Sequence, residues 1–105
     1  AAAKEGFMER VFTEAERQRL KSGNNDPQRI AGAFAAKEAV AKALGTGIGI
    51  VEWKEIEINH DERGRPIAAL SGKAARLMEG MGGRALHVSV SHIRDIAAAQ
   101  AILEG

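Results

Sequence analysis

Hydrophobic residues follow a helical spacing in the first half of the chain and a strand-like spacing in much of the second half. Ile30 and Phe34 lie four residues apart, whereas Leu86, Val88 and Val90 recur at every second position. A spacing of three or four is typical of a helix that buries one face, and a spacing of two is typical of a half-buried strand. The pattern therefore predicts helices first and a region with several strands after them.

A helix-starting signal stands at Thr13. Glu16 follows it by three residues, which is the spacing of a capping box, where each side chain accepts a hydrogen bond from the other residue's backbone amide. The helix that begins here is predicted to end near Ser22, because Gly23 is suited to the C-terminal cap.

A second helix is predicted from Asp26 to about Leu44. Asp26 can cap its first turn, and Pro27 occupies the first helical position, where no amide donor is needed. Gly45 follows Leu44 and opens a glycine-rich turn at 45–49. Glycine commonly ends a helix because it readily adopts left-handed backbone angles.

Turn residues divide the second half of the chain into short elements. The predicted elements are a strand at 53–58, a strand at 67–71, a helix at 73–81, a strand at 86–91 and a strand at 96–103. Trp53 lies out of step with the alternation in its strand. The segment 59–66 has the character of a hairpin loop in which Gly64 supplies a positive φ, and 92–95 is predicted to turn the chain.

The order of these elements indicates the fold class. Consecutive strands that are joined by short turns pair antiparallel, so the prediction is an α+β fold, an antiparallel sheet packed with helices. The length of 105 residues suits a single domain, 1–105.

Composition narrows the classes of function. A net charge of +1 gives no general attraction to nucleic acid or to a membrane. The lack of cysteine excludes disulfides, a thiolate nucleophile and cysteine metal sites. The apolar runs are too short to span a bilayer, and no signal-peptide pattern opens the chain, so a cytoplasmic protein is expected.

Glu38 and Lys42 form the first candidate site. They lie four residues apart, in series with Ile30 and Phe34, so Glu38 is expected at the edge of the buried stripe. On spacing alone, a simple ion pair with Lys42 is the more common arrangement. The alternative is a phosphoryl-transfer site, in which the carboxylate holds Mg²⁺ and the lysine neutralises phosphate charge.

Gly45 and Gly47 belong to the turn that follows this helix. Glycine lets a backbone approach a phosphate closely, but the segment lacks the Walker pattern and follows a helix instead of preceding one. A helix cap with its loop is therefore the simpler interpretation of these two residues.

His92 and several basic residues near the start of the chain are further candidates. A histidine in a turn is either solvated or available to a phosphate or a base. Arg10 and Arg17 can share a helix face with Lys21. That face is either an ordinary solvated surface or a docking site for an acidic partner.

Six segments of the chain, in order, resemble the motifs of holo-[acyl-carrier-protein] synthase, the small phosphopantetheinyl transferase. They are RVFTEAE, AGAFAAKEAVAKALGTGIG, WKEIEI, GRP, HVSVSH and AAAQAILE. The resemblance extends over almost the whole chain from Phe7 onward, and its central segment is the most specific.

This resemblance implies a reaction and a set of site residues. The reaction is transfer of 4′-phosphopantetheine from coenzyme A to a serine of apo-acyl-carrier protein, with adenosine 3′,5′-bisphosphate as the other product. The implied residues are Glu38 and Lys42 for catalysis, Glu38 for Mg²⁺, Lys42, Gly45, Gly47 and His92 for coenzyme A, and Arg10 and Arg17 for the acidic carrier protein. The resemblance also implies a homotrimer with active sites between subunits, and no nucleic-acid or membrane partner is expected.

The chain departs from the family pattern at its start. No strand of the form G-[IT]-D-I-V-E-I, whose aspartate is the second metal ligand in the family, precedes Phe7, and we expect that the chain as printed omits it. Ala33 and Ile93 stand where relatives often carry an arginine and a hydroxyl residue. The alternative function is therefore a catalytically impaired module that binds the carrier protein or coenzyme A. A nucleic-acid-binding domain that uses GMGGR as a clamp has no aromatic platform to support it.

Overall fold

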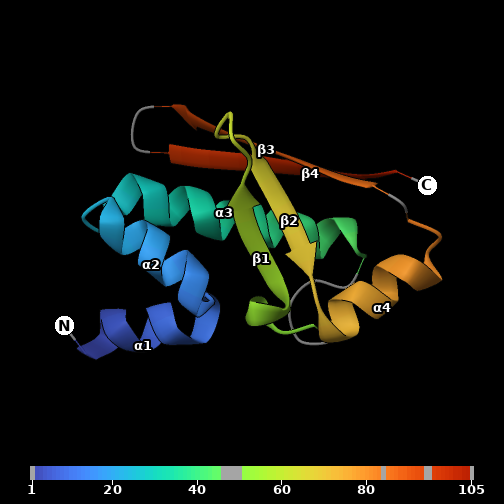
Figure 1. Cartoon of the computed structure of the whole chain (residues 1–105), viewed down its shortest axis with the longest axis horizontal. Helices are drawn as coiled ribbons and strands as arrows, with labels where there is room; N and C mark the ends of the chain where they lie inside the picture. The colour runs from blue at the N-terminus through green and yellow to red at the C-terminus, as the bar shows by residue number, and fades with distance from the viewer. Residues whose placement is uncertain (1, 46–50, 84, 94–95, 105) are drawn as a thin grey trace.

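The computed structural model describes residues 2–45, 51–83, 85–93 and 96–104 (Figure 1). Its elements are α1 (Ala2–Val11), α2 (Glu14–Ser22), α3 (Pro27–Ala43), the 3-10 helix η1 (Trp53–Glu55), β1 (Ile56–His60), β2 (Pro66–Leu70), α4 (Gly72–Gly80), β3 (Ala85–Ile93) and β4 (Ile96–Glu104). Among these described residues, no helix is long and apolar enough to cross a membrane.

The helix α1 was not among the predicted elements. It is held in place by tertiary packing of Met8, Val11 and Phe12 in a core that also contains Leu20 of α2. Local sequence signals do not report such packing, so α1 was not predicted.

The predicted start and end of α2 are confirmed. The backbone amide of Thr13 donates to Oε1 of Glu16 at 2.8 Å, and the amide of Glu16 donates to Oγ1 of Thr13 at 3.2 Å. Gly23 caps the other end. The capping box was readable from the sequence because every group in it lies within three residues of its partner.

The predicted bounds of α3 are also close to those observed. The amide of Gln28 donates to Oδ1 of Asp26 at 3.0 Å, and Pro27 stands in the first turn. Leu44 is the C-terminal cap, and Gly45 has a φ of 80°. The left-handed angle at Gly45 is one that a residue with a side chain adopts with difficulty, so the helix ends there.

The strand predicted at 53–58 begins later in the structure. Trp53–Glu55 forms the 3-10 helix η1, and β1 extends instead to His60. The ring of Trp53 packs on Phe34, with 4.9 Å between centroids. Trp53 is out of step with the alternation because it belongs to η1 and not to the strand. In the loop between β1 and β2, Gly64 has the predicted positive φ.

Two antiparallel hairpins form the β-structure. β1 pairs with β2 from Ile56 opposite Leu70 to His60 opposite Pro66, and β3 pairs with β4 from Ala85 opposite Glu104 to Ile93 opposite Ile96. Because β3 continues through Ile93, His92 lies within the strand, opposite Ala97. Residues 92 and 93 of the predicted turn 92–95 therefore belong to β3, and 94 and 95 lie outside the described residues.

The two hairpins lie on different sides of α3 (Figure 1). α3 contacts β3, β4 and β1, and the two hairpins also contact each other through β2 and β3. The α+β class with antiparallel pairing is confirmed, although the described strands form two separate two-stranded ladders instead of one sheet. The position of α3 is therefore set by its packing against β1, β3 and β4, with the Lys37–Glu16 pair as a link to α2.

Candidate functional site

The buried face of α3 differs from the face that the spacing suggested. Its buried residues are Gly32, Ala36, Lys37, Val40 and Ala41, and the cap Leu44 is buried with them. Ile30 and Phe34 are only partly buried, and they pack against a second cluster that contains Phe12. Alanine lies on every side of this helix, so the alternation of large and small residues did not identify the buried stripe.

Glu38 and Lys42 are both exposed in the structure. Within the described part of the chain, no ion pair or hydrogen bond joins them to each other or to another side chain. The ion pair that spacing alone favoured is therefore not formed. The carboxylate and the ammonium group lie one helical turn apart on the surface, where both are available to a ligand.

The buried charge of the segment FAAKEA is Lys37, the residue before Glu38. Its side chain is 0% exposed, and its Nζ lies 2.5 Å from Oε1 of Glu16 and 2.5 Å from the carbonyl oxygen of Ile56. The same Nζ lies 5.4 Å from the ring centroid of Phe12. Burial lowers the pKa of Lys37, while the hydrogen bond to Glu16 acts in the opposite direction.

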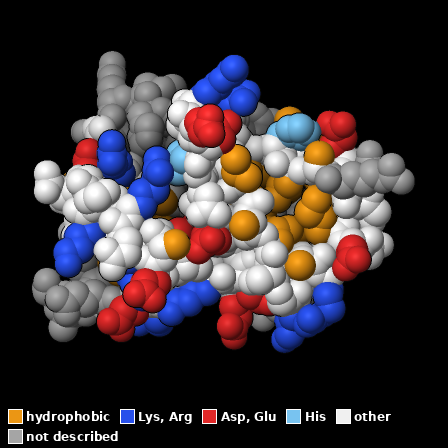
Figure 2. Space-filling model, in the orientation of Figure 1, with side chains coloured by type: hydrophobic (Ala, Val, Ile, Leu, Met, Phe, Trp, Pro, Cys, Tyr) orange, Lys and Arg blue, Asp and Glu red, His pale blue; other side chains and the backbone are white. Residues whose placement is uncertain are grey.

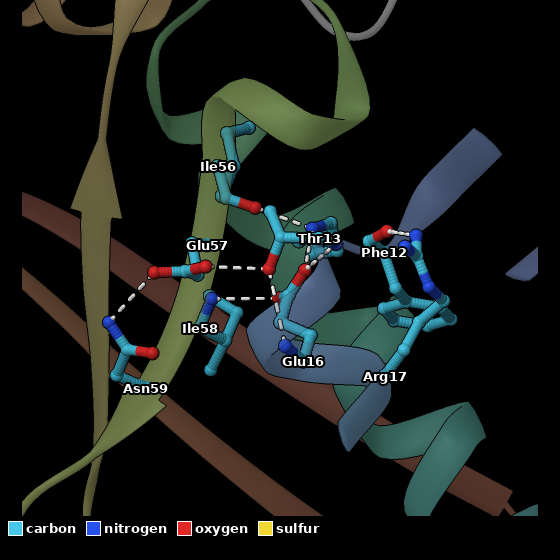
Figure 3. Close-up of polar contacts among 9 residues, drawn as sticks. Phe12, Thr13, Glu16, Arg17, Ile56, Glu57, Ile58 and Asn59 are labelled. Atoms are coloured by element: carbon cyan, nitrogen blue, oxygen red, sulfur yellow. Dashed lines mark hydrogen bonds and ion pairs between the residues drawn. The ribbon is translucent and has the colours of Figure 1, made fainter. Parts of the chain in front are cut away.

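Glu16 accepts hydrogen bonds from α3, from β1 and from Thr13, the cap of its own helix (Figure 3). Besides Lys37 and the amide of Thr13, the amide of Ile58 donates to its Oε2 at 2.8 Å. The residue is only 4% exposed. A buried carboxylate with this many donors is satisfied, which meets the usual condition for burying a charge.

The hydroxyl of Thr13 extends this network to the surface of β1 (Figure 3). It donates to Oε1 of Glu57 at 2.6 Å, and the side-chain amide of Asn59 donates to Oε2 of the same residue at 3.2 Å. The sequence predicted Thr13 and Glu16 as a local cap. It did not predict that both side chains also join α2 to β1, because those contacts are 42 to 44 residues apart in the chain.

The structure describes some of the other residues that were predicted to bind coenzyme A. Gly45 is exposed at the end of α3, and Gly47 lies outside the described residues. The backbone of His92 lies near the end of β3, and its side chain is outside what the structure describes.

The two predicted docking arginines do not share a helix face, because α1 ends at Val11 and α2 begins at Glu14, so Arg10 and Arg17 belong to different helices. Arg10 is exposed in the last turn of α1. Arg17 is partly buried, and its Nη1 donates to the carbonyl oxygen of Phe12 at 2.6 Å. Arg17 therefore stabilises the junction between α1 and α2, whereas the charge of Arg10 is fully available at the surface.

Aspartates in the described residues are used by turns and caps. Asp26 caps α3, and Asp61 accepts from the amides of Arg63 and Arg65 in the β1–β2 loop, each at 2.9 Å. The backbone hydrogen bond from Arg65 lowers the pKa of Asp61. Among the residues that the structure describes, no group of three histidine, aspartate or glutamate side chains is gathered for a metal ion.

A pocket of about 320 Å³ lies between α2, α3 and the β1–β2 hairpin. Arg19, Arg29 and His60 are among its lining residues, and Lys and Arg side chains are numerous on this side of the molecule (Figure 2). Nδ1 of His60 is buried without a hydrogen-bond partner. Burial lowers the pKa of His60, and the positive charge of Arg19 lowers it further.

Comparison with known proteins identifies the class. Residues 1–101 match the family model of the 4′-phosphopantetheinyl transferase superfamily, and the chain belongs to this superfamily. A curated relative, the holo-[acyl-carrier-protein] synthase of Koribacter versatilis (strain Ellin345), is 46% identical over 99 residues, which cover 93% of this chain and 79% of the relative. The resemblance of the six sequence segments is thereby confirmed.

Solved structures of the same kind share the fold. The holo-[acyl-carrier-protein] synthase of Helicobacter pylori in complex with coenzyme A has a TM-score of 0.84 at 31% identity, and the match covers 98% of this chain and 85% of that chain. The synthase of Bacillus anthracis str. Ames in complex with CoA (3′,5′-ADP) has a TM-score of 0.77 at 40% identity, covering 97% and 83%.

Proposed function

We propose that the protein transfers 4′-phosphopantetheine from coenzyme A to a serine hydroxyl of apo-acyl-carrier protein. The observation that carries this proposal is the exposed Glu38–Lys42 face of α3, without internal partners among the described residues, in a chain that matches the transferase superfamily over residues 1–101. The names of its relatives, which include the synthase and coenzyme A, support the choice of substrates.

The proposed reaction is an in-line displacement at the β-phosphorus of coenzyme A. A bond forms between the serine oxygen and this phosphorus, the bond from phosphorus to the bridging oxygen breaks, and adenosine 3′,5′-bisphosphate leaves with that oxygen. The serine hydroxyl releases its proton to water as the bond to phosphorus forms. Lys42 contributes a positive charge next to the phosphates, which stabilises the charge that develops in the transition state.

Mg²⁺ is part of this proposal, with Glu38 as its ligand from this chain. Mg²⁺ commonly keeps several waters and is held by one or two carboxylates together with substrate phosphates. A single exposed carboxylate such as Glu38 fits that pattern. When bound, the ion neutralises the diphosphate.

The pocket beside α2 is the proposed place for an anionic part of coenzyme A. Arg19 and Arg29 line it, and neither has an acidic partner among the described residues. Arginine side chains are well suited to phosphate groups. A volume of about 320 Å³ is in the range of small-molecule sites.

The position of this pocket supports an active site that two copies of the chain share. Ala36 lines the pocket, and residues of a helix are rotated by about 100° each, so Glu38 lies about 200° around α3 from it. A coenzyme A molecule that contacts both the pocket and Glu38 does so most directly when the pocket belongs to one copy of the chain and Glu38 belongs to another. The homotrimer with sites between subunits, and the cytoplasmic location, remain parts of this proposal.

Mass spectrometry of the carrier protein tests the proposed function. Incubation of the purified protein with apo-acyl-carrier protein, coenzyme A and Mg²⁺ is expected to add one phosphopantetheine mass to the carrier and to release adenosine 3′,5′-bisphosphate. A carrier with its active serine replaced by alanine is the control. If the carrier binds but its mass does not change, the protein is instead a binding module without transferase activity.

A further inference from the structure

The buried pair of Lys37 and Glu16 joins the helix that carries Glu38 and Lys42 to the rest of the protein. Lys37 belongs to α3, Glu16 belongs to α2, and the carbonyl of Ile56 belongs to β1. Lys37 directly precedes Glu38 in the chain, so any rotation or shift of α3 that breaks the contacts of Lys37 also moves the exposed pair.

The remaining buried contacts of α3 are apolar. Gly32, Ala36 and Ala41 are small, and Val40 and the cap Leu44 pack in the core with Ile56 and Ile58 of β1. Apolar packing holds the helix in the core but has no preferred bond direction. Directional hydrogen bonds have narrow ranges of distance and angle. The two bonds of Lys37, both 2.5 Å long, therefore add a directional constraint on the rotation and axial position of α3 to the apolar packing of its core residues.

The contact between α3 and α2 is a buried ion pair, Lys37 with Glu16, where hydrophobic residues could also pack. Replacement of a buried ion pair by hydrophobic residues is often neutral or stabilising for the folded protein. A fully buried lysine is thus poorly explained by stability alone, and a role in holding one defined arrangement is the better explanation for these particular contacts.

We propose that Lys37 is a positioning residue, and that its bonds to Glu16 and to the carbonyl of Ile56 hold α3 in the orientation in which Glu38 and Lys42 meet the diphosphate. This inference rests on the proposed transferase function. Lys37 does not touch the substrate; it acts through the backbone of α3, and a displacement of a catalytic group by about 1 Å can lower a rate by roughly a hundredfold.

The double variant Lys37→Met/Glu16→Gln tests the proposal, because it removes both buried charges and leaves no unpaired ion. We expect it to remain folded by circular dichroism, to lose roughly tenfold to a hundredfold in kcat, and to show a smaller change in KM for the carrier protein. The matched control is Lys73→Met, which removes an exposed lysine of α4 and is expected to keep the wild-type kcat.

Calorimetry supplies a readout that does not depend on turnover. Coenzyme A is titrated with and without Mg²⁺ into the wild type and into the double variant. We expect Mg²⁺ to strengthen coenzyme A binding in the wild type and to do so less in the variant. A folded double variant with the wild-type kcat and the wild-type effect of Mg²⁺ overturns the positioning role.

Glu16→Asp keeps the proposal testable if the double variant does not fold. Aspartate retains the charge but is one methylene shorter, so it draws Lys37 and α3 toward α2. A fall in kcat with an intact fold supports positioning, whereas a loss of stability at unchanged kcat contradicts it. A wild-type protein that transfers no phosphopantetheine refutes the proposed function itself, and in that case the calorimetric comparison still reports whether the pair affects coenzyme A binding.

Discussion

Lys37 and Glu38 are neighbours in the chain but lie in opposite environments. The side chain of Lys37 is 0% exposed and bonded to Glu16, whereas Glu38 is exposed and has no bonded partner among the described residues. A helix turns by about 100° per residue, so adjacent positions can serve the interior and a ligand at once. The segment FAAKEA therefore combines a buried charge with an exposed one, and the proposed function assigns Mg²⁺ to the exposed carboxylate.

Replacement of Glu38 by glutamine is expected to lower the rate of phosphopantetheine transfer while leaving the free energy of unfolding nearly unchanged. The change keeps the size of the side chain and removes the charge of an exposed residue, so the free energy of unfolding should change by no more than about 0.5 kcal/mol. Transfer of phosphopantetheine should fall by about a hundredfold or more, and the Mg²⁺ concentration for half-maximal rate should rise. The measurements are chemical denaturation and a Mg²⁺ titration of carrier modification.

Glu62→Gln is the matched control for this prediction, because Glu62 is an exposed glutamate in the β1–β2 loop. It should leave both the rate and the Mg²⁺ dependence unchanged. A Glu38→Gln protein with the wild-type Mg²⁺ dependence shows that Glu38 is not a metal ligand.

The structure also shows where prediction from sequence succeeds. The caps at Thr13 and Asp26 were predicted, because each depends on groups within three residues of each other. The family was predicted from its motifs, and the superfamily match confirms it. The roles of Glu38 and Lys42, which rest on the same motifs, stay predictions. Local chemistry and a specific motif are therefore readable without coordinates.

Features that depend on contacts between residues far apart in the chain could not be predicted from the sequence. The burial of Lys37 depends on Glu16, 21 residues earlier, and on Ile56, 19 residues later. In an alanine-rich helix the apolar spacing does not show which side is covered, so the lysine resembled a surface residue. α1 was missed for a related reason, since Phe7 contacts Phe34 across the fold, with 5.6 Å between ring centroids.

Gly72→Ala is expected to destabilise the start of α4. Gly72 has a φ of 55°, and the carboxylate of Glu55, which accepts from the amide of Lys73, occupies the space where a Cβ would stand. The left-handed backbone alone costs about 1–2 kcal/mol for a residue with a side chain. Chemical denaturation should therefore show a loss of at least about that size.

A second glycine of the same helix provides the comparison. At Gly80 the space that a Cβ would occupy is open, with no neighbouring atom within 4 Å, and the backbone has no left-handed φ. Gly80→Ala should stabilise the protein by up to about 1 kcal/mol, because alanine has the higher helix propensity. Equal effects of the two substitutions would contradict the role assigned to Glu55 at Gly72.

The stability of the protein is expected to fall on acidification through the pKa of unfolded histidine. Burial, with the charge of Arg19 next, lowers the pKa of His60 below 6.5 in the folded state. As pH falls below 6.5, the unfolded chain binds a proton that folded His60 does not yet accept, so the unfolded state gains stability. The slope is at most about 1.4 kcal/mol per pH unit, and it ends below the folded pKa, where both states are protonated.

His60→Gln removes this proton uptake from the unfolded chain at that position. Denaturation of the wild type and the variant between about pH 7.5 and about pH 5 should show a shallower fall for the variant. The imidazole titration of His60, followed by NMR in the folded protein, should have its midpoint below 6.5. A midpoint at or above that value contradicts the prediction.

Reversal of charge at Arg10 is expected to weaken the carrier protein's encounter with the enzyme. Arg10 is exposed at the end of α1, and the proposed carrier is acidic, so Arg10→Glu replaces attraction by repulsion. KM for the carrier should rise on the order of tenfold at low salt and less at high salt, while KM for coenzyme A stays unchanged. Steady-state kinetics at two ionic strengths measures this. Arg63→Glu, an exposed reversal in the β1–β2 loop, is the control, and equal effects of the two would show that only overall charge matters and that α1 is not the docking face.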